Sequence, residues 1–391
     1  MSALAGGIES GPIVPSPASF PDSPLSAALS QPLMLGLFLP LQSGAWSAST
    51  LPRTTTWTFD YIAALTRRAE EIGFDLVFGL AEWVRHGGYG GTTRFREESL
   101  DPFITASALS AITHRILLIS TIHILYGPWH PLHLAKFGAT LDHISGGRWG
   151  MNVVTGYAPR EPAMFGMQKV EHDKRYEMAG EFADMMETLW RSDSDVTHEG
   201  QFWRLDGAFV RPRPRFGRPI MVSATGSPAG FAYAGRHSDI AFITSPAGVE
   251  IEATLAVLPD HVARLKAAGR ACGRELRAII NPMIVCRPTE AEARAYYDAI
   301  IAAADDAAVD GYAAHHAAAD SKAWSNHRRQ DRILGGNVHL IGDPRQVADW
   351  LVRLKLAGCD GVQLTFFDFQ PDLEFFAAEV LPLLKQAGVR R

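Results

Sequence analysis

The chain has 391 residues, of which 47% are hydrophobic and 20% charged, and its formal net charge is −5. This composition is typical of a globular protein, and the length suits one large α/β barrel or two ordinary domains. The small acidic excess is spread along the chain without a basic run, which argues against nucleic acid or an anionic membrane as a partner. Three scattered cysteines, Cys272, Cys286 and Cys359, favour neither a disulfide framework nor a zinc site and suit a reducing cytoplasm.

The first 30 residues differ in composition from the rest of the chain. They are rich in Ala, Ser, Pro and Gly and carry no basic residue, whereas a secretory signal needs basic residues followed by an apolar run. No run of about 18 apolar residues, the length needed to span a membrane, occurs in the sequence. We expect residues 1–30 to form a flexible arm, disordered or lying over a neighbouring subunit, and residues 31–391 to form a single cytoplasmic domain.

From residue 32 onward, short apolar runs alternate with amphipathic stripes of helical period. The predicted strands of the first half are 33–40, 74–82, 115–125 and 148–156. The predicted helices of the first half are 59–73, 102–114, 130–147 and 173–190. Gly73 closes the first of these helices as a C-cap, and a polar excursion over 191–218 follows the last one.

The second half repeats the alternation. Its predicted strands are 219–226, 239–245, 276–286 and 361–369, and its predicted helices lie at 227–238, 250–272, within 339–359 after a turn, and at 373–388. Strands that are apolar on both faces belong in a parallel sheet covered by helices. Eight strand–helix units predict an α/β fold of the closed TIM (β/α)8 type, and the GxGxxG fingerprint of an open dinucleotide-binding sheet is missing.

The barrel is predicted to carry insertions, since long segments outside the barrel elements occur at 41–58, 83–101, 191–218 and 303–338. The last of them ends in a glycine pair, Gly335-Gly336, and contains the basic group His327 to Arg329. It is either a lid over the active site or an ordinary surface excursion.

Active sites of such barrels lie at the carboxyl ends of the strands. Those ends hold mostly small polar residues, with aromatic residues in the loops beyond: Ala81-Glu82, Thr121-Ile122-His123, Asn152 to Gly156, Thr225-Gly226-Ser227 and Thr365. A planar, hydrogen-bonding and partly apolar cofactor would fit this lining.

The junction Gly226-Ser227-Pro228 is the clearest phosphate-binding candidate. Ser227 is a predicted N-cap and Pro228 a predicted first helical residue, so unpaired backbone N–H groups point outward there. A helix N-terminus of this kind binds phosphate, although an ordinary capped helix would have the same sequence. Arg175 and Tyr176, at the start of the helix after the fourth strand, supply a cation and a phenol that could reach the same phosphate.

Other side chains have two interpretations each. Glu82 is either a base or substrate-orienting group, or a structural residue paired with Arg85. His123 is either a proton donor or hydrogen-bond donor at the cofactor, or a satisfied core histidine. Trp129 and His130 either line a substrate pocket or pack against the following helix.

Metal catalysis and serine hydrolysis are disfavoured. Five histidines fall within 30 residues, but a strand, a loop and a helix separate them and no paired carboxylates stand at ligand spacing. They are His114, His123, His130, His133 and His143. No G-x-S-x-G elbow occurs, and we expect no metal.

Several blocks, in a fixed order, resemble the flavin-dependent monooxygenases of the bacterial luciferase superfamily. The strongest is SGGRWGMNVVTGYAPREPAMFG (145–166), followed by EHDKRY (171–176). The others are GGYGGTTRFREESLDPF, ATGSPAG, LIGDPRQVAD and LTFFDF. The similarity covers about residues 32–390 and is greatest to the group of dimethylsulfone, alkanesulfonate and pyrimidine monooxygenases.

The resemblance implies a two-component FMN-dependent monooxygenase. A separate NAD(P)H-dependent flavin reductase would supply reduced FMN, which with O2 oxygenates a small organic substrate such as a sulfone, a sulfonate or a heterocycle, with bond cleavage. The resemblance also implies a homodimer or homotetramer. A deazaflavin-dependent oxidoreductase and a non-catalytic flavin-binding protein of the same fold remain as alternatives.

The resemblance also implies roles for individual positions. Ser227, Arg175 and Tyr176 match positions that contact the FMN phosphate in the family. Positions along the ring and ribityl chain match Ala81, Glu82, Asn152 and Glu161, and the adjacent strand ends add Thr121 and Gly226 to the cofactor-binding set. In the family a non-prolyl cis peptide supports the flavin ring, and here it would join Ile122 and His123.

Overall fold

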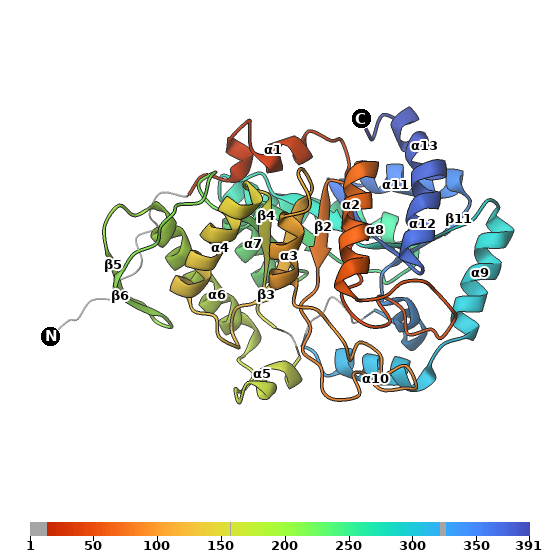
Figure 1. Ribbon diagram of the computed structural model, residues 1–391, viewed down its shortest axis with the longest axis horizontal. Helices are drawn as coiled ribbons and strands as arrows, with labels where there is room; N and C mark the ends of the chain where they lie inside the picture. Colours follow the sequence, from red (N-terminus) through yellow and green to blue (C-terminus); the bar gives the residue numbers. More distant parts are fainter. Residues whose placement is uncertain (1–13, 157, 321–325) are drawn as a thin grey trace.

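The computed structural model describes residues 14–156, 158–320 and 326–391 (Figure 1). Within these residues, eight parallel strands close into a barrel. In barrel order they are β1 (Met34–Phe38), β2 (Leu76–Gly79), β3 (Leu117–His123), β4 (Trp149–Val154), β7 (Ile220–Ala224), β8 (Ile240–Ile243), β9 (Arg277–Ile280) and β12 (Gly361–Phe366). Pairing of Met34 with Gly361 closes the ring between the first and last strands. The predicted TIM barrel is confirmed, and its members are the eight predicted strands.

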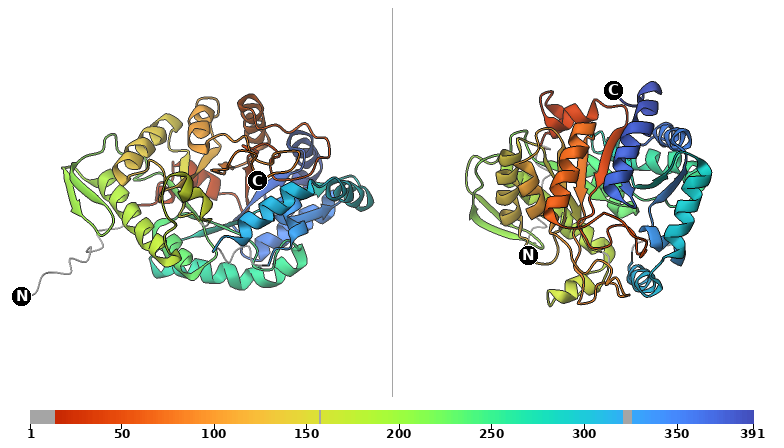
Figure 2. Two further views of the ribbon diagram at one scale, coloured as in Figure 1. Left: turned by 90° about the horizontal axis from the view of Figure 1, so that it is seen from below. Right: turned by 45° about the vertical axis from the view of Figure 1, so that its right-hand side comes forward.

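Helices cover the outer side of the strands, as the views in Figure 1 and Figure 2 show. They are α2 (Phe59–Ile72), α3 (Pro102–Ser110), α4 (Pro131–Ser145), α6 (His172–Arg191), α7 (Pro228–His237), α8 (Ile251–Ala271), α11 (Pro344–Leu356), α12 (Phe369–Phe375), the π-helical turn η4 (Phe376–Val380) and α13 (Leu381–Gln386). All residues of β1 and β3 are buried, because one face of each strand lines the barrel interior and the other meets helices. Gly73 ends α2 with φ of 102°, which confirms the predicted C-cap. In the described residues, no helix is both long and apolar enough to cross a membrane.

The predicted strand 276–286 is interrupted at Asn281, which separates β9 from β10 (Pro282–Cys286). Both parts pair with β12 in one continuous register, since Val362 pairs with Ile280 and Met283 with Thr365. On its other side β10 pairs with β11 (Val338–Gly342), which the sequence analysis had assigned to a turn. The N-cap of α11, Asp343, follows β11 directly, so the sequence pattern places the apolar residues of β11 in the turn that leads into this helix. It extends the sheet beside β10 and is not a member of the ring.

Two of the predicted insertions contain regular structure. The polar excursion 191–218 holds an antiparallel hairpin of β5 (Val196–Glu199) and β6 (Arg204–Ala208). The segment 303–338 contains α10 (Asp306–Ala317) and the 3-10 helix η3 (Arg329–Leu334), and α9 (Glu290–Ala302) precedes it. The short helix α5 (Arg160–Met164) follows β4.

The segment expected to be a flexible arm, residues 1–30, contains regular structure in the part that the structure describes. Residues 14–30 form η1 (Pro17–Ser19) and α1 (Pro24–Leu29), and residues 1–13 lie outside the described ranges. Ser23 caps α1 with its side chain and Pro24 takes the first helical position, which is a strong start signal for a helix. Leu25 is fully buried, so α1 packs on the barrel through an apolar contact that the polar composition of the segment concealed.

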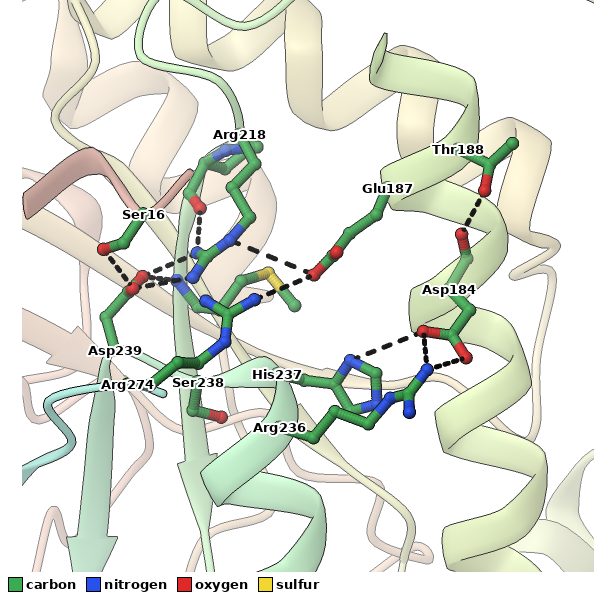
Figure 3. A network of polar contacts seen from close by, with 12 residues as sticks. Ser16, Asp184, Glu187, Thr188, Arg218, Arg236, His237, Ser238, Asp239 and Arg274 are labelled. Atoms are coloured by element: carbon green, nitrogen blue, oxygen red, sulfur yellow. Dashed lines mark hydrogen bonds and ion pairs between the residues drawn. The ribbon is translucent and has the colours of Figure 1, made fainter. Parts of the chain in front are cut away.

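A buried network of charges fixes this segment to the amino end of the barrel (Figure 3). The Arg218 guanidinium, 0% exposed, donates to both Asp239 carboxylate oxygens at 2.6 and 2.7 Å. Ser16 donates to the same carboxylate, and Glu187 of α6 lies 4.0 Å from Arg218 and 3.9 Å from Arg274. Because Arg218 and Asp239 precede β7 and β8, the network lies at the end of the barrel opposite the strand carboxyl ends.

Candidate active site

A cavity of about 550 Å³ opens at the carboxyl ends of the barrel strands. Its volume lies within the range of about 300–1,000 Å³ that is usual for small-molecule sites. The residues predicted to bind cofactor or act in catalysis all line it: Ala81, Glu82, Thr121, His123, Asn152, Glu161, Arg175, Tyr176, Gly226 and Ser227. They come from the ends of β2, β3, β4 and β7, from α5 and from α6, so the barrel brings together residues far apart in sequence.

One end of the cavity is formed by the N-terminus of α7 and the first turn of α6. Ser227 is the N-cap of α7 and accepts from the Gly230 backbone N–H at 3.1 Å, with Pro228 as the first helical residue, as predicted. A Cβ atom on Gly230 would lie 1.8 Å from the Thr225 hydroxyl oxygen and 2.8 Å from the Tyr176 hydroxyl oxygen. The absence of a side chain on Gly230 therefore leaves room for these two hydroxyls beside the helix N-terminus. We call the N-terminus of α7, together with Thr225, Ser227, Arg175 and Tyr176, the phosphate end.

Tyr176 is suited to donate a hydrogen bond at the phosphate end. Burial raises the pKa of its phenol, against the opposing effect of hydrogen bonds with Thr225 and Ser227. The phenol therefore keeps its proton at neutral pH. Backbone N–H groups, a hydroxyl and a phenol at a helix N-terminus form a set that fits a phosphate monoester.

Arg175, also predicted to contact the phosphate, already forms an ion pair with a carboxylate of the protein. Its guanidinium donates to the two carboxylate oxygens of Asp320 at 3.0 and 2.9 Å and to the backbone oxygen of Val170 at 3.0 Å. The Lys169 ammonium lies 2.9 Å from the same carboxylate. Asp320 follows α10 and was not among the predicted site residues, because no local pattern links it to a residue 145 positions away.

The middle of the cavity contains an unsatisfied amide. The Asn152 side-chain nitrogen donates to the Thr121 hydroxyl at 3.0 Å. The Asn152 side-chain oxygen is buried and has no hydrogen-bond partner among the described residues. An acceptor held in this way is ready for the N–H group of a ligand, and the flavin ring carries such a group.

Next to it, His123, Tyr126 and Glu161 form a buried cluster. The Tyr126 hydroxyl donates to Glu161 Oε2, His123 Nε2 lies 3.7 Å from the same oxygen, and the His123 and Tyr126 rings stack at 4.9 Å. Burial raises the pKa of Glu161 to about 7, with repulsion from Glu82 adding to the effect and the Tyr126 hydrogen bond and Arg160 opposing it. Burial lowers the pKa of His123 to about 3.

At neutral pH His123 is therefore uncharged, and Glu161 is the group of this cluster that exchanges a proton near pH 7. Glu161 was expected only to contact the cofactor, and Tyr126 was not among the predicted site residues. The Tyr126 position showed no signal, because its role depends on the approach of α5 to the end of β3.

Glu82 is held in place by a cation, although not by Arg85. Arg96 Nη1 lies 3.1 and 3.3 Å from the two Glu82 carboxylate oxygens, and the Tyr89 hydroxyl donates to the carboxylate at 2.7 Å. Arg96 is itself 1% exposed and lies 4.8 Å from the ring centroid of Trp46 and 4.8 Å from that of Tyr312. The pair with Arg85 offered as one interpretation of Glu82 is wrong, because the loop 83–101 folds back so that its far end, and not its start, supplies the guanidinium.

These residues define the other end of the cavity, which we call the aromatic end. Its lining comes mainly from three of the predicted insertions: Trp46, Glu82, Arg96, Tyr312, His316 and Asn337. Asn337 accepts from Asn281 at 2.6 Å and so ties the segment before β11 to the break between β9 and β10. The segment 303–338 therefore contributes to the cavity wall through α10 and Asn337.

Trp129 and His130, predicted to line a substrate pocket, do not line the main cavity. Trp129 borders a small pocket of about 20 Å³, which shares Ala81, Thr121 and His123 with the main cavity and has room for about one water molecule. The Trp129 ring packs on Phe103 at 5.7 Å, and His130 is the N-cap of α4, accepting from the Leu132 N–H at 3.2 Å.

The end of β3 also differs from one expectation. Across the described ranges the cis peptide is Arg211–Pro212, so the expected cis bond between Ile122 and His123 is wrong. β3 continues through His123, which pairs regularly with Val154 of β4. In the part of the chain that the structure describes, no three His, Cys, Asp or Glu side chains gather where they could hold a metal ion.

Comparison with known proteins gives a consistent result. The profile of the family described as luciferase-like monooxygenase matches residues 34–361. The chain is 32% identical to an FMNH2-dependent dimethylsulfone monooxygenase of Pseudomonas putida, over 93% of this chain and 98% of that protein. It is 30% identical to the pyrimidine monooxygenase RutA of Rhizobium rhizogenes, over 90% of this chain and 96% of that protein.

Solved structures agree in fold. A riboflavin lyase, RcaE, crystallised with modified FMN and riboflavin, superposes with a TM-score of 0.80 and 26% identity, covering 92% of both chains. DmoA from Hyphomicrobium sulfonivorans superposes with a TM-score of 0.77 at 20% identity, covering 92% of this chain and 89% of that chain, which supports the fold alone. With its barrel, its cavity at the strand ends and these matches over most of its length, the chain belongs to the luciferase-like monooxygenase family.

Proposed function

We propose that the protein is the oxygenase component of a two-component system. A separate NAD(P)H-dependent reductase supplies reduced FMN, and this chain brings reduced FMN, O2 and a small organic substrate together in one cavity. An FMN-dependent monooxygenase is the type of enzyme that family membership and the curated relatives support. The observation that carries the assignment is that one cavity combines three features. It has hydrogen-bond donors at the N-terminus of α7, an unsatisfied amide oxygen in its middle and aromatic walls at its other end.

Each part of the cavity has a role in this proposal. Ser227 and Tyr176 at the phosphate end would bind the FMN phosphate, with Arg175 beside them, and Asn152 would accept from the flavin ring. Reduced FMN, when bound, supplies the electrons that activate O2. The chain itself orients the reactants, excludes water and, through Glu161, holds or releases a proton near pH 7.

The substrate would bind at the aromatic end. Arg96 there is matched by the Glu82 carboxylate, so this end has no unbalanced positive charge to attract an anion. Among the lining residues that the structure describes, this balance favours an uncharged substrate, such as a sulfone or a heterocycle, over a sulfonate. We further propose that the protein works in the cytoplasm as a homodimer or homotetramer.

Anaerobic titration with reduced and oxidised FMN, followed by mixing with oxygenated buffer, tests the proposal. We expect tighter binding of reduced than oxidised FMN, and a rate of flavin reoxidation that differs from that of free reduced FMN. Ser227→Ala should weaken FMN binding more than riboflavin binding, because it alters only the phosphate end. Failure to bind either form of FMN would reject the assignment, and binding of a deazaflavin instead would favour the oxidoreductase alternative.

A further inference from the structure

The phosphate end already contains an anionic group in the place where an anion is expected. We propose that the Asp320 carboxylate occupies the anion-binding position on Arg175 and that the phosphate of FMN must exchange with it, so that Asp320 sets the affinity for phosphorylated flavin. The proposal rests on the proposed function, and it adds a residue that determines how strongly the site distinguishes FMN from riboflavin.

The geometry of the Arg175–Asp320 pair is that of a bound anion. Both terminal guanidinium nitrogens are used, at 3.0 and 2.9 Å from the two carboxylate oxygens, and Lys169 adds a third contact at 2.9 Å. This two-pronged arrangement is the one in which arginine also binds phosphate. Arg175 is 4% exposed and Asp320 is about one-third exposed, so the guanidinium is fixed and the carboxylate is the partner that can leave.

The charge around the pair makes simultaneous occupation unfavourable. Burial opposes ionisation of Asp320, yet the contacts with Arg175 and Lys169 bring its pKa below the ordinary value, so it is an anion at neutral pH. Glu171 and Asp173, at the start of α6, line the same part of the cavity. A phosphate monoester beside Arg175 would add close to two negative charges at pH 7, and these charges would repel the Asp320 carboxylate strongly.

Uncharged donors nearby allow the exchange to take place. The N-terminus of α7, Ser227 and Tyr176 supply donors that hold the phosphate while the Asp320 carboxylate separates from Arg175. Arg175 strengthens binding only after Asp320 withdraws, and the free energy of breaking the carboxylate contacts is subtracted from the affinity. Wild-type FMN binding is thus weaker than the donors alone would give, while riboflavin, which has no phosphate, leaves the pair intact.

The test compares Asp320→Asn with wild type for binding of reduced FMN and reduced riboflavin under anaerobic conditions. Asparagine keeps the size of the side chain but removes its charge. The control is Asp195→Asn, an exposed aspartate just before β5, which makes the same change of net charge away from the cavity. Thermal unfolding of each variant checks that the fold is intact.

We expect Asp320→Asn to bind reduced FMN about tenfold more tightly, to bind riboflavin as wild type does, and Asp195→Asn to change neither. Unchanged or weaker FMN binding in Asp320→Asn, with wild type still preferring FMN to riboflavin, would overturn the role of Asp320 and leave the proposed function standing. Equal affinity for FMN and riboflavin in both proteins would overturn this inference and the phosphate end together.

Discussion

Replacing Glu161 with glutamine should remove a large part of the pH dependence of folding. The carboxyl is 2% exposed, and burial raises its pKa from 4.5 to about 7. The folded protein therefore retains this proton over a pH range in which the unfolded chain has lost it. A glutamine side chain has nearly the same shape and can still accept from the Tyr126 hydroxyl through its oxygen, so the variant tests the charge and little else.

The sign and the size of the effect follow from these two pKa values. Below pH 4.5 Glu161 is protonated in both states and costs nothing. As the pH rises from 4.5 to about 7, the unfolded state ionises first, so the free energy of unfolding falls. At about 1.4 kcal/mol for each pH unit, the loss reaches about 3 kcal/mol by pH 7 and then stays constant.

Urea unfolding of wild type and Glu161→Gln at several values between pH 5 and 8 measures this quantity. Titration of groups distant from Glu161 is common to both proteins and cancels in the difference. His123, with a pKa of about 3, stays uncharged in the folded protein over this pH range. We expect the variant to gain about 2–3 kcal/mol relative to wild type between pH 5 and 8. Glu98→Gln, at an exposed position, serves as the matched control, and its free energy of unfolding should change with pH as that of wild type does. The same pH dependence for Glu161→Gln and wild type would refute the burial argument.

Three further predictions concern other parts of the fold. Asp239→Asn should lower the free energy of unfolding by about 3–5 kcal/mol, because it leaves a buried guanidinium without its carboxylate, whereas Asp195→Asn should cost almost nothing in the same urea experiment. Gly230→Ala should weaken FMN binding at least tenfold, since its methyl group would lie 1.8 Å from the Thr225 hydroxyl oxygen, and fluorescence titration showing wild-type affinity would contradict this close approach. Burial lowers the pKa of His339 from 6.5 to about 4, so the free energy of unfolding falls as the pH drops below 6.5. His339→Gln should therefore avoid about 2 kcal/mol of this loss at pH 5. If the difference in free energy of unfolding between variant and wild type were the same at pH 7 and pH 5, the prediction would be wrong.

The sequence was sufficient where a feature depends on neighbouring residues. Apolar runs located all eight barrel strands, and the order Ser227-Pro228 located the helix N-terminus at the phosphate end. The sequence was not sufficient to predict contacts between side chains that lie far apart along the chain. The nearby Arg85 was one possible partner for Glu82, although Arg96 is the partner, and nothing in the sequence linked Asp320 to Arg175.

Composition also misled at two places. A polar, proline-rich segment suggested a flexible arm, but a single well-capped helix with Leu25 on its inner face is enough to attach residues 24–29 to the barrel. A tryptophan next to a predicted strand end suggested a pocket wall, but Trp129 packs on Phe103 of α3 and does not line the main cavity. Both errors concern packing, which becomes visible only once the helices are placed.

The position of β11 bears on how relatives of this protein could diverge. β11 pairs with β10 beyond the closed ring, and the segment that leads into it carries Tyr312 and Asn337 of the aromatic end. Lengthening, shortening or replacing that segment would leave every pairing of the eight-stranded ring in place. Changes in the segment that leads into β11 could therefore alter substrate specificity during evolution, while the barrel and the phosphate end of the cavity stay unchanged.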